Sequence, residues 1–316
     1  MTTLNARNGE GEERLEIQAP TIGDWFKSVR MWFSGAFDEL YKSKTAMAGA
    51  CMLLSLIIVL VFAPVISGYD PVKPDYNAFI QEPSAEHLFG TDRFGRDIFA
   101  RVLWGGRRLV SIAFAAVFFG LILGIPAGFI AGYYGGYTDA MIMRVVDGLL
   151  AFPGILLYLL LVTLAREWHL EGILNDLILI FALGFAFSPE AARLSRGAVL
   201  TEKHKEYVEA SHTTGEADLY IAFRQIGPNC VSPLIVESTV RLGYAILIIA
   251  ALSFLGLGTP PPTPDWGGDL SSARDYMETN PYVAIFPGLA ICYTVLAFNL
   301  FGDGLRDILD PRVVER

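Results

Sequence analysis

Long apolar runs separated by polar loops constrain the fold of this sequence more than any other feature. A helix that crosses the hydrocarbon core of a membrane needs roughly 20 mainly apolar residues. Charged residues make up only 18% of the chain, which is below the level typical of soluble domains, and 53% of the residues are hydrophobic. We therefore predict an all-α polytopic membrane protein with about six transmembrane helices. The expected spans are residues 46–66, 109–133, 145–165, 173–187, 233–255 and 282–301.

The polar N-terminal segment predicts a separate region in front of the first span. A secretory signal peptide would begin near the first residue, whereas the first apolar run starts at residue 46 and is long. Apolar side chains spaced three and four apart share one face of a helix here: Trp25, Val29, Trp32, Phe33, Phe37 and Leu40. Such a helix would lie in the cytoplasmic membrane interface, which we favour, or pack on other protein. We predict a cytosolic extension at residues 1–45 and a membrane domain at 46–316.

The distribution of lysine predicts that the N-terminus faces the cytosol, because basic residues gather in cytosolic loops. With the N-terminus inside, five of the six lysines fall on the cytosolic side: Lys27, Lys42, Lys44, Lys203 and Lys205. The first outer loop goes against the rule, since it carries Lys73, Arg93, Arg96, Arg101, Arg107 and Arg108. We keep the orientation because Lys42 and Lys44 flank the first span and the other outer loops hold almost no positive charge.

Glycines recur every four residues along the second span, at Gly120, Gly124, Gly128 and Gly132. Residues four apart share one stripe of a helix, and small residues let a neighbouring helix approach closely. We predict tight helix packing along this stripe.

A polar segment between the fourth and fifth spans predicts a helical hairpin in the cytosol. Residues 202–213 have helical composition, and Gly215 can adopt the left-handed conformation that ends a helix. Residues 216–226 form a second helical run, which Gly227 and Pro228 are expected to stop. A hairpin of this kind between two spans is a natural docking surface.

The hairpin resembles the EAA loop of ATP-binding cassette (ABC) importer permeases. The residues that carry the resemblance are Glu209-Ala210, Gly215, Ile226 and Pro228. The chain departs from the pattern at Ser211, where a second alanine is usual, and at Gly227, where leucine is usual. The resemblance implies that this loop seats a helix in a groove of an ATPase subunit. The implied coupling residues are Tyr207, Glu209, Ala210, Ser211, Thr213, Thr214, Gly215, Ile226 and Pro228.

Three further blocks are similar to the peptide and nickel permeases, and specifically to the subunit type of dipeptide and oligopeptide importers. The first block is His87-Leu-Phe-Gly-Thr-Asp92 with Gly95-Arg-Asp97. The second is Gly132-Tyr-Tyr-Gly-Gly136 with Asp139, Met143-Arg144, Asp147 and Pro153. The third is Leu252-Ser-Phe-Leu-Gly-Leu-Gly258 with Pro261, Pro262, Pro264 and Trp266-Gly267. The resemblance covers residues 46–311.

This resemblance also implies partners and a location. A second, homologous permease would complete the pore, two ATPase subunits would bind ATP and Mg²⁺, and an extracytoplasmic solute-binding protein would deliver substrate. The chain would lie among the lipids of a bacterial or archaeal cytoplasmic (inner) membrane. Selectivity in this family lies largely in the binding protein, so dipeptides, longer peptides, opines, glutathione and nickel complexes all stay open as substrates.

Charged residues inside or beside the spans offer further candidate sites. Glu237 and Arg241 lie four apart in the fifth span, where a charge costs on the order of 3 kcal/mol by insertion scales. They would line the translocation path or form a buried structural pair, and the sequence favours neither. Arg144 and Asp147 are interpreted as a local ion pair, which we favour, or as a hinge contact with the ATPase side. We predict that two loop clusters act through salt bridges and helix caps: Asp92, Arg96 and Asp97, and Asp265, Asp269 and Arg274.

Several other functions lack their sequence signals. None of the six lysines follows a glycine, so the phosphate-binding loop of an ATPase is absent, and we predict a non-catalytic subunit without a cofactor of its own. No cluster indicates a metal site, and no basic stripe indicates nucleic acid. A stand-alone secondary transporter is the alternative, but it would need coupling acids and usually an internal repeat. A membrane-embedded enzyme would need a catalytic cluster.

Overall fold

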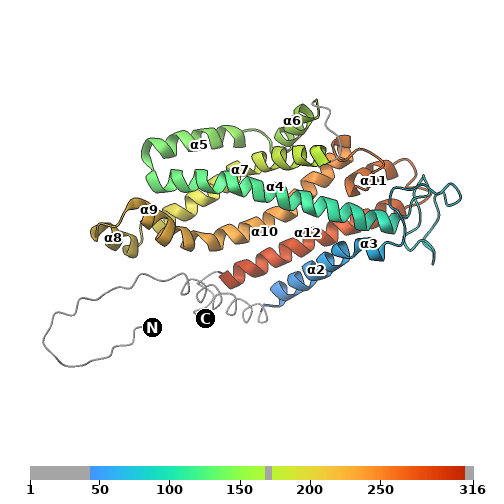
Figure 1. Cartoon of the computed structure of the whole chain (residues 1–316), viewed down its shortest axis with the longest axis horizontal. Coiled ribbons are helices and arrows are strands. Elements are labelled where there is room, and N and C mark those ends of the chain that lie inside the picture. Colours follow the sequence, from blue (N-terminus) through green and yellow to red (C-terminus); the bar gives the residue numbers. More distant parts are fainter. Residues whose placement is uncertain (1–42, 168–172, 310–316) are drawn as a thin grey trace, which may run out of the picture. The chain divides into compact units, whose positions relative to one another are not determined.

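The computed structural model of the chain describes residues 43–167 and 173–309, all within one compact unit, Leu40–Arg316. The regular elements in these two ranges are all helical (Figure 1). Five helices are long and apolar enough to cross a membrane, and a bent pair makes a sixth crossing if it is counted as one span. This confirms the predicted all-α polytopic fold. The amphipathic helix predicted near residues 25–40 lies outside the described residues.

The long helices run between two ends of the unit, with short elements at each end (Figure 1). The long elements are α2 (Lys44–Val61) with α3 (Ala63–Ile66), α4 (Ile98–Tyr134), α5 (Gly136–Leu150) with α6 (Gly154–Arg166), α7 (Ile173–Lys203), α10 (Gly227–Leu252) and α12 (Tyr282–Leu309). The short ones are α8 (Glu206–Thr213), α9 (Asp218–Tyr220), two π-helical turns (Ile221–Ile226 and Ser253–Leu257) and α11 (Trp266–Ala273). We call the end with α8 and α9 the hairpin end, and the end with residues 67–97 the loop end.

The third span was predicted as one continuous run over residues 145–165, and the structure differs from this prediction. In the structure α5 and α6 meet at 87°, with the break at residues 151–153. Pro153 explains the break, because proline has no backbone N–H to donate and disfavours helical conformation in the residue before it. The chain therefore turns sharply within this apolar segment.

The glycine stripe of α4 packs against α7, as predicted. A Cβ atom added to Gly124 would lie 2.3 Å from the Ser188 carbonyl oxygen, and one added to Gly128 would lie 1.9 Å from that of Ala192. Real Cβ atoms do not approach backbone this closely, so only glycine permits the contact. Close approach of this kind is the usual basis of helix association in membranes, where lipid is as apolar as the side chains.

Two hydrophobic clusters hold the helices together. The larger one lies among α4, α6, α7, α10, α11 and α12 and includes the fully buried Leu183, Ile246 and Trp266. The smaller one lies at the hairpin end and is built from Tyr133, Val199, Val208, Ile221, Ala222, Ile226, Cys230 and Leu234. We call the smaller one the hairpin-end core. It joins five separate elements, namely α4, α7, α8, the π-helical turn at Ile221–Ile226 and α10, and therefore fixes the hairpin on the helix ends.

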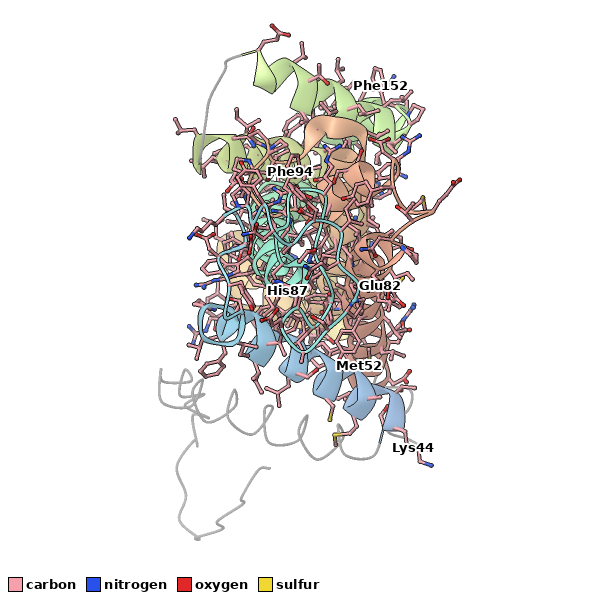
Figure 2. The ribbon with its side chains drawn as sticks, turned by 90° about the vertical axis from the view of Figure 1, so that its right-hand side faces the viewer. Lys44, Met52, Glu82, His87, Phe94 and Phe152 are labelled. Carbon is pink, nitrogen blue, oxygen red and sulfur yellow. The ribbon has the colours of Figure 1, made fainter. Side chains whose placement is uncertain are left out.

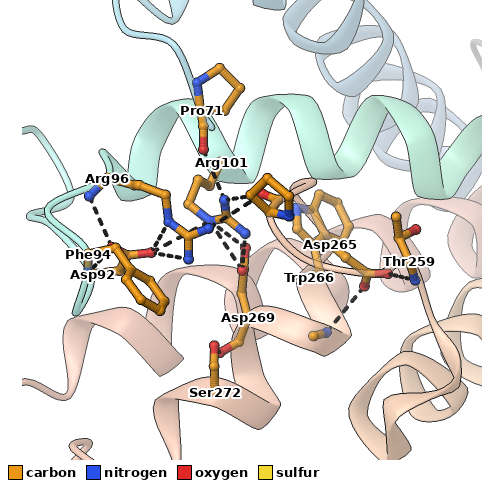
Figure 3. A network of polar contacts seen from close by, with 12 residues as sticks. Pro71, Asp92, Phe94, Arg96, Arg101, Thr259, Asp265, Trp266, Asp269 and Ser272 are labelled. Atoms are coloured by element: carbon orange, nitrogen blue, oxygen red, sulfur yellow. Dashed lines mark hydrogen bonds and ion pairs between the residues drawn. The ribbon is translucent and has the colours of Figure 1, made fainter. Parts of the chain in front are cut away.

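A buried ionic network occupies the loop end (Figure 3). Arg96 forms an ion pair with Asp92 at 2.6 Å, and Arg101 forms one with Asp269 at 2.5 Å. Arg101 also donates to the carbonyl oxygens of Pro71 and Pro262, at 2.9 and 3.1 Å. Burial raises the pKa of Asp269 above its ordinary value, and the Arg101 guanidinium opposes that rise. The carboxylates of Asp92 and Asp269 therefore neutralise two of the arginines that counted against the predicted orientation of the chain.

Helix caps complete the loop end, which Figure 2 views with Glu82, His87 and Phe94 labelled. The Asp97 carboxylate accepts a hydrogen bond from the Ala100 N–H at the start of α4 (2.7 Å) and lies 2.9 Å from His87 Nδ1. Asp265 caps α11 in the same way. These contacts confirm the structural role predicted for both clusters, except at Arg274, whose guanidinium lies over the Phe254 ring instead of joining an acid.

The local pair predicted between Arg144 and Asp147 is wrong. Asp147 forms its ion pair with Arg193 of α7, at 2.6 Å. Asp139, about two helical turns earlier in α5, pairs with Arg196 of α7. Two ion pairs between helices thus hold α5 beside α7.

Candidate coupling hairpin and intramembrane charge cluster

Helix α8 is short, polar and sharply ended. Glu206 and Glu209 lie in its first turn and His212 in its last, which suits the dipole of the helix. Gly215 follows with a φ of +76°. Its N–H donates to the His212 carbonyl oxygen (3.1 Å), and the Glu216 N–H donates to that of Ser211 (3.2 Å). This pair of bonds is the Schellman ending, and it confirms the predicted left-handed glycine.

The helix does not extend back to residue 202 as predicted. The chain breaks at His204 and Lys205, so α7 ends at Lys203 and α8 begins at Glu206. Val208, which is buried in the hairpin-end core, holds α8 against the helix ends. Glu209 and Ala210 remain exposed on the helix.

The second arm of the hairpin is not stopped at Gly227 and Pro228, contrary to the prediction. It runs from α9 through the π-helical turn straight into α10. Pro228 lies in the first turn of α10, where a missing N–H removes no intrahelical hydrogen bond. The π-helical turn at Ile221–Ile226, with its i→i+5 hydrogen bonds, links α9 to α10 without ending the helix. One long rod therefore leads from the hairpin into the membrane span.

The predicted coupling residues are brought together only in part. Tyr207, Glu209, Ala210, Thr213, Thr214 and Gly215 are exposed around α8, and Ser211 is half-buried. Ile226 is fully buried in the hairpin-end core, and Pro228 is exposed at the start of α10. The candidate docking surface is therefore the exposed face of α8 at Glu209, Ala210, Thr213 and Thr214, together with the turn at Gly215. Tyr207 and Ser211 instead bond back to neighbouring helices, and Ile226 supports the surface from within.

Two large apolar side chains on the hairpin were missed by the sequence reasoning. Leu219 is 63% exposed in α9, and Phe223 is 70% exposed in the π-helical turn. Phe223 also stacks on Phe129 of α4, with ring centroids 5.7 Å apart. The apolar run that starts at Leu219, inside the otherwise polar segment between the two spans, was the signal that could have identified it. Aromatic side chains are enriched in protein interfaces, so Phe223 with its neighbour Leu219 marks a candidate contact surface.

Polar contacts tie α8 to the neighbouring helices. The Tyr207 hydroxyl donates to Glu202 Oε2 (2.8 Å), and Asn229 Nδ2 donates to the Tyr207 hydroxyl (3.0 Å). The Ser211 hydroxyl donates to Gln225 Oε1 (2.7 Å). Partial burial and the bond to Glu202 raise the pKa of Tyr207 above its ordinary value, so its hydroxyl stays neutral and able to donate.

A second group of charges lies within the spans. Arg241 of α10 forms ion pairs with Glu237 of the same helix (2.9 Å) and with Glu190 of α7. The Arg241 side chain is 12% exposed, whereas those of Glu190 and Glu237 are 46% and 39% exposed. The predicted pair is therefore a cluster of three, and its third member lies on another helix. Its formal charge is −1 when both carboxylates are ionised.

These features define the class of protein: a polytopic helical membrane protein with an exposed helical hairpin between two spans. The fold is similar to a chain of the inward-facing MetNI methionine ABC transporter, with a TM-score of 0.52. That match covers 66% of this chain and 96% of the other, at 19% sequence identity. The likeness concerns the fold.

Residues 124–315 match the family described as "Binding-protein-dependent transport system inner membrane component". The chain belongs to this family. Residues 31–83 match the "N-terminal TM domain of oligopeptide transport permease C". Family membership confirms the predicted ABC importer permease and decides against the stand-alone secondary transporter.

The regions of similarity to curated relatives cover most of this chain. The dipeptide transport system permease protein DppC of Alkalihalophilus pseudofirmus is 40% identical over 298 residues, which cover 94% of this chain and 95% of that protein. The glutathione transport system permease protein GsiD of Escherichia coli is 45% identical over 269 residues, which cover 85% of this chain and 86% of that protein. Both relatives are named as permease proteins of transport systems, one for dipeptides and the other for glutathione.

Proposed function

We propose that this chain forms the pore of an importer for small peptides or peptide-like solutes together with a second, homologous permease. Two ATPase subunits bind ATP and Mg²⁺ in this assembly, an extracytoplasmic binding protein delivers the substrate, and the chain itself catalyses no reaction. The observation that carries the proposal is the rigid hairpin exposed between spans α7 and α10. The names of two similar relatives support peptide-like substrates.

The hairpin is the proposed contact with the ATPase. Its exposed side combines the acidic α8, the sharp turn at Gly215 and the apolar Leu219. Hydrogen bonds of Tyr207 and Ser211, the hairpin-end core and the π-helical turn fix it to α4, α7 and α10. A partner that moves the hairpin therefore moves the spans.

The charge cluster is the proposed lining of the translocation path. Partly exposed carboxylates on spanning helices would face lipid at a high cost unless this side of the bundle borders water or protein. The positions of Glu190, Glu237 and Arg241 support a polar side of the chain along α7 and α10.

Purification of the assembled transporter through a tag on this chain tests the proposal. We expect a second permease and an ATPase to co-purify, and ATP hydrolysis to rise when the ligand-loaded binding protein is added. Mass spectrometry identifies the partners and the ligand carried by the binding protein. A chain that purifies alone and transports solute without ATP would contradict the proposal.

The proposed orientation places the N-terminus and the hairpin in the cytosol of a bacterial or archaeal cell, within its cytoplasmic membrane. The lysine distribution supports it. In a variant without the native cysteines, a cysteine at Lys205 should react with a maleimide only after the membrane is made permeable. A cysteine at Thr263 should react with an impermeant maleimide in intact cells. The reverse labelling would overturn the orientation.

A further inference from the structure

The Tyr207 hydroxyl lies at a junction of three helices. It belongs to α8, donates to Glu202 at the end of α7 and accepts from Asn229 in the first turn of α10. The Asn229 side chain also donates to the Gln225 carbonyl oxygen at 2.9 Å, which fixes its amide in place. Lys205 holds the other oxygen of Glu202 at 2.6 Å. Glu202 and Asn229, the two residues that bond to the Tyr207 hydroxyl, are thus each fixed by a further contact.

The remaining links between α8 and the spans are few. Val208 packs into the hairpin-end core, and Ser211 bonds to Gln225 of the π-helical turn. The apolar contact of Val208 is non-directional, so it resists separation but not sliding or rotation of α8. The hydrogen bonds of Tyr207 are directional and reach α7 and α10 at the same time.

The two helices that meet at Tyr207 are also joined deeper in the bundle. Arg241 of α10 pairs with Glu190 of α7, and it lies several helical turns from Asn229 along α10. α10 is continuous from Gly227 to Leu252, so a displacement at its first turn is carried along its axis. The same two helices therefore carry both the junction at Tyr207 and the charge cluster.

We propose that Tyr207 is the positioning residue that transmits movement of α8 to α7 and α10, through Glu202 and Asn229 respectively. The inference rests on the proposed docking of α8 on the ATPase, and it assigns the transmission to one hydroxyl group. Removal of that hydroxyl separates docking from coupling, because the exposed docking face of α8 is left unchanged.

The test compares Tyr207→Phe with Tyr137→Phe, a control whose side chain is 92% exposed on α5. Each variant is purified as the full transporter and reconstituted in liposomes. Uptake is measured with alanyl-alanine or glutathione, whichever the unmodified transporter carries, together with ATP hydrolysis. In Tyr207→Phe we expect normal amounts of ATPase, continued hydrolysis, and uptake per ATP reduced roughly tenfold, as befits the loss of one or two net hydrogen bonds. Tyr137→Phe should behave like the unmodified protein.

A double-mutant cycle identifies the partner. Asn229→Ala should also lower uptake per ATP, and the Tyr207→Phe/Asn229→Ala double variant should be no worse than Tyr207→Phe alone, because both changes remove the same bond. Normal coupling in Tyr207→Phe would overturn the proposal, and so would loss of ATPase from that complex, since Tyr207 would then act in docking. If Gly215→Val also keeps its ATPase and its coupling, the docking proposal fails as well. Normal coupling in Tyr207→Phe alone refutes only the transmission.

Discussion

Replacement of Arg241 by alanine is expected to reduce the yield of the assembled transporter at least tenfold. Arg241 holds Glu190 and Glu237, and its removal leaves two carboxylates in the spans without their cation. Stranding a fully buried charge costs 3–5 kcal/mol, and because these carboxylates are partly exposed we expect about 2 kcal/mol. The measurement is the amount of monodisperse complex recovered in detergent, followed by uptake in liposomes.

Neutral variants separate the effect of charge from that of shape. The triple variant Glu190→Gln/Arg241→Met/Glu237→Gln has no uncompensated charge, so its assembly should recover toward the unmodified level. If its uptake stays low, the cluster acts in transport; if uptake also recovers, the cluster is a structural one. Arg144→Ala, at an exposed position of α5, is the matched control and should assemble normally. Mild, additive effects of the single changes would contradict the cluster altogether.

Introduction of valine at Gly215 is expected to remove most of the ATPase from the purified complex while the spans stay inserted. Gly215 has a φ of +76°, and a Cβ there would meet no other atom within 4 Å. The penalty is therefore one of backbone conformation, and it should distort the Schellman turn that presents α8 and Leu219. The measurement is the ratio of ATPase to permease after affinity purification. Glu209→Gln should have a milder effect in the same direction.

Gly68→Val is the matched control for backbone strain. Gly68 has a φ of +63° and open space around it, but it lies at the loop end. It should lose a similar amount of local stability and keep its ATPase. Retention of ATPase in both valine variants would show that the turn is not part of the docking surface.

The variant Leu219→Asp tests the same docking surface at its exposed apolar side chain. Loss of a well-placed interface anchor costs about 2 kcal/mol or more, which would weaken ATPase binding roughly thirtyfold. Leu88→Asp, in the loop at the opposite end and also exposed, should leave the ATPase bound. Equal binding by both aspartate variants would place the docking site elsewhere.

Features that depend on neighbours in the chain were predictable. The apolar runs predicted the crossings because a spanning helix satisfies its own backbone and must present apolar side chains over its whole length. The spacing of Gly124 and Gly128 predicted the close helix contact, since residues four apart share a stripe. Gly215 predicted the end of α8 because glycine is the usual residue in that conformation.

The predictions failed where two local signals in the sequence favoured different structures. Gly227 and Pro228 are helix breakers by composition, yet the helix continues because the proline falls in its first turn. In the third span the apolar composition suggested one helix, and Pro153 bends it by 87° instead. The outcome depended on where each residue lies relative to a helix end, which composition does not specify.

The pairing of charges between different helices was decided only by tertiary structure. Glu190 meets Arg241 across α7 and α10, and Asp147 meets Arg193 across α5 and α7, over distances of many residues along the chain. Tyr207 likewise meets Asn229 only because the hairpin folds α8 back on the start of α10. An ion pair or hydrogen bond depends on the positions of two atoms in space, and helix packing sets those positions. The sequence by itself therefore determined the spans, the glycine contact and the end of α8, whereas the packing of the helices determined which charges face one another.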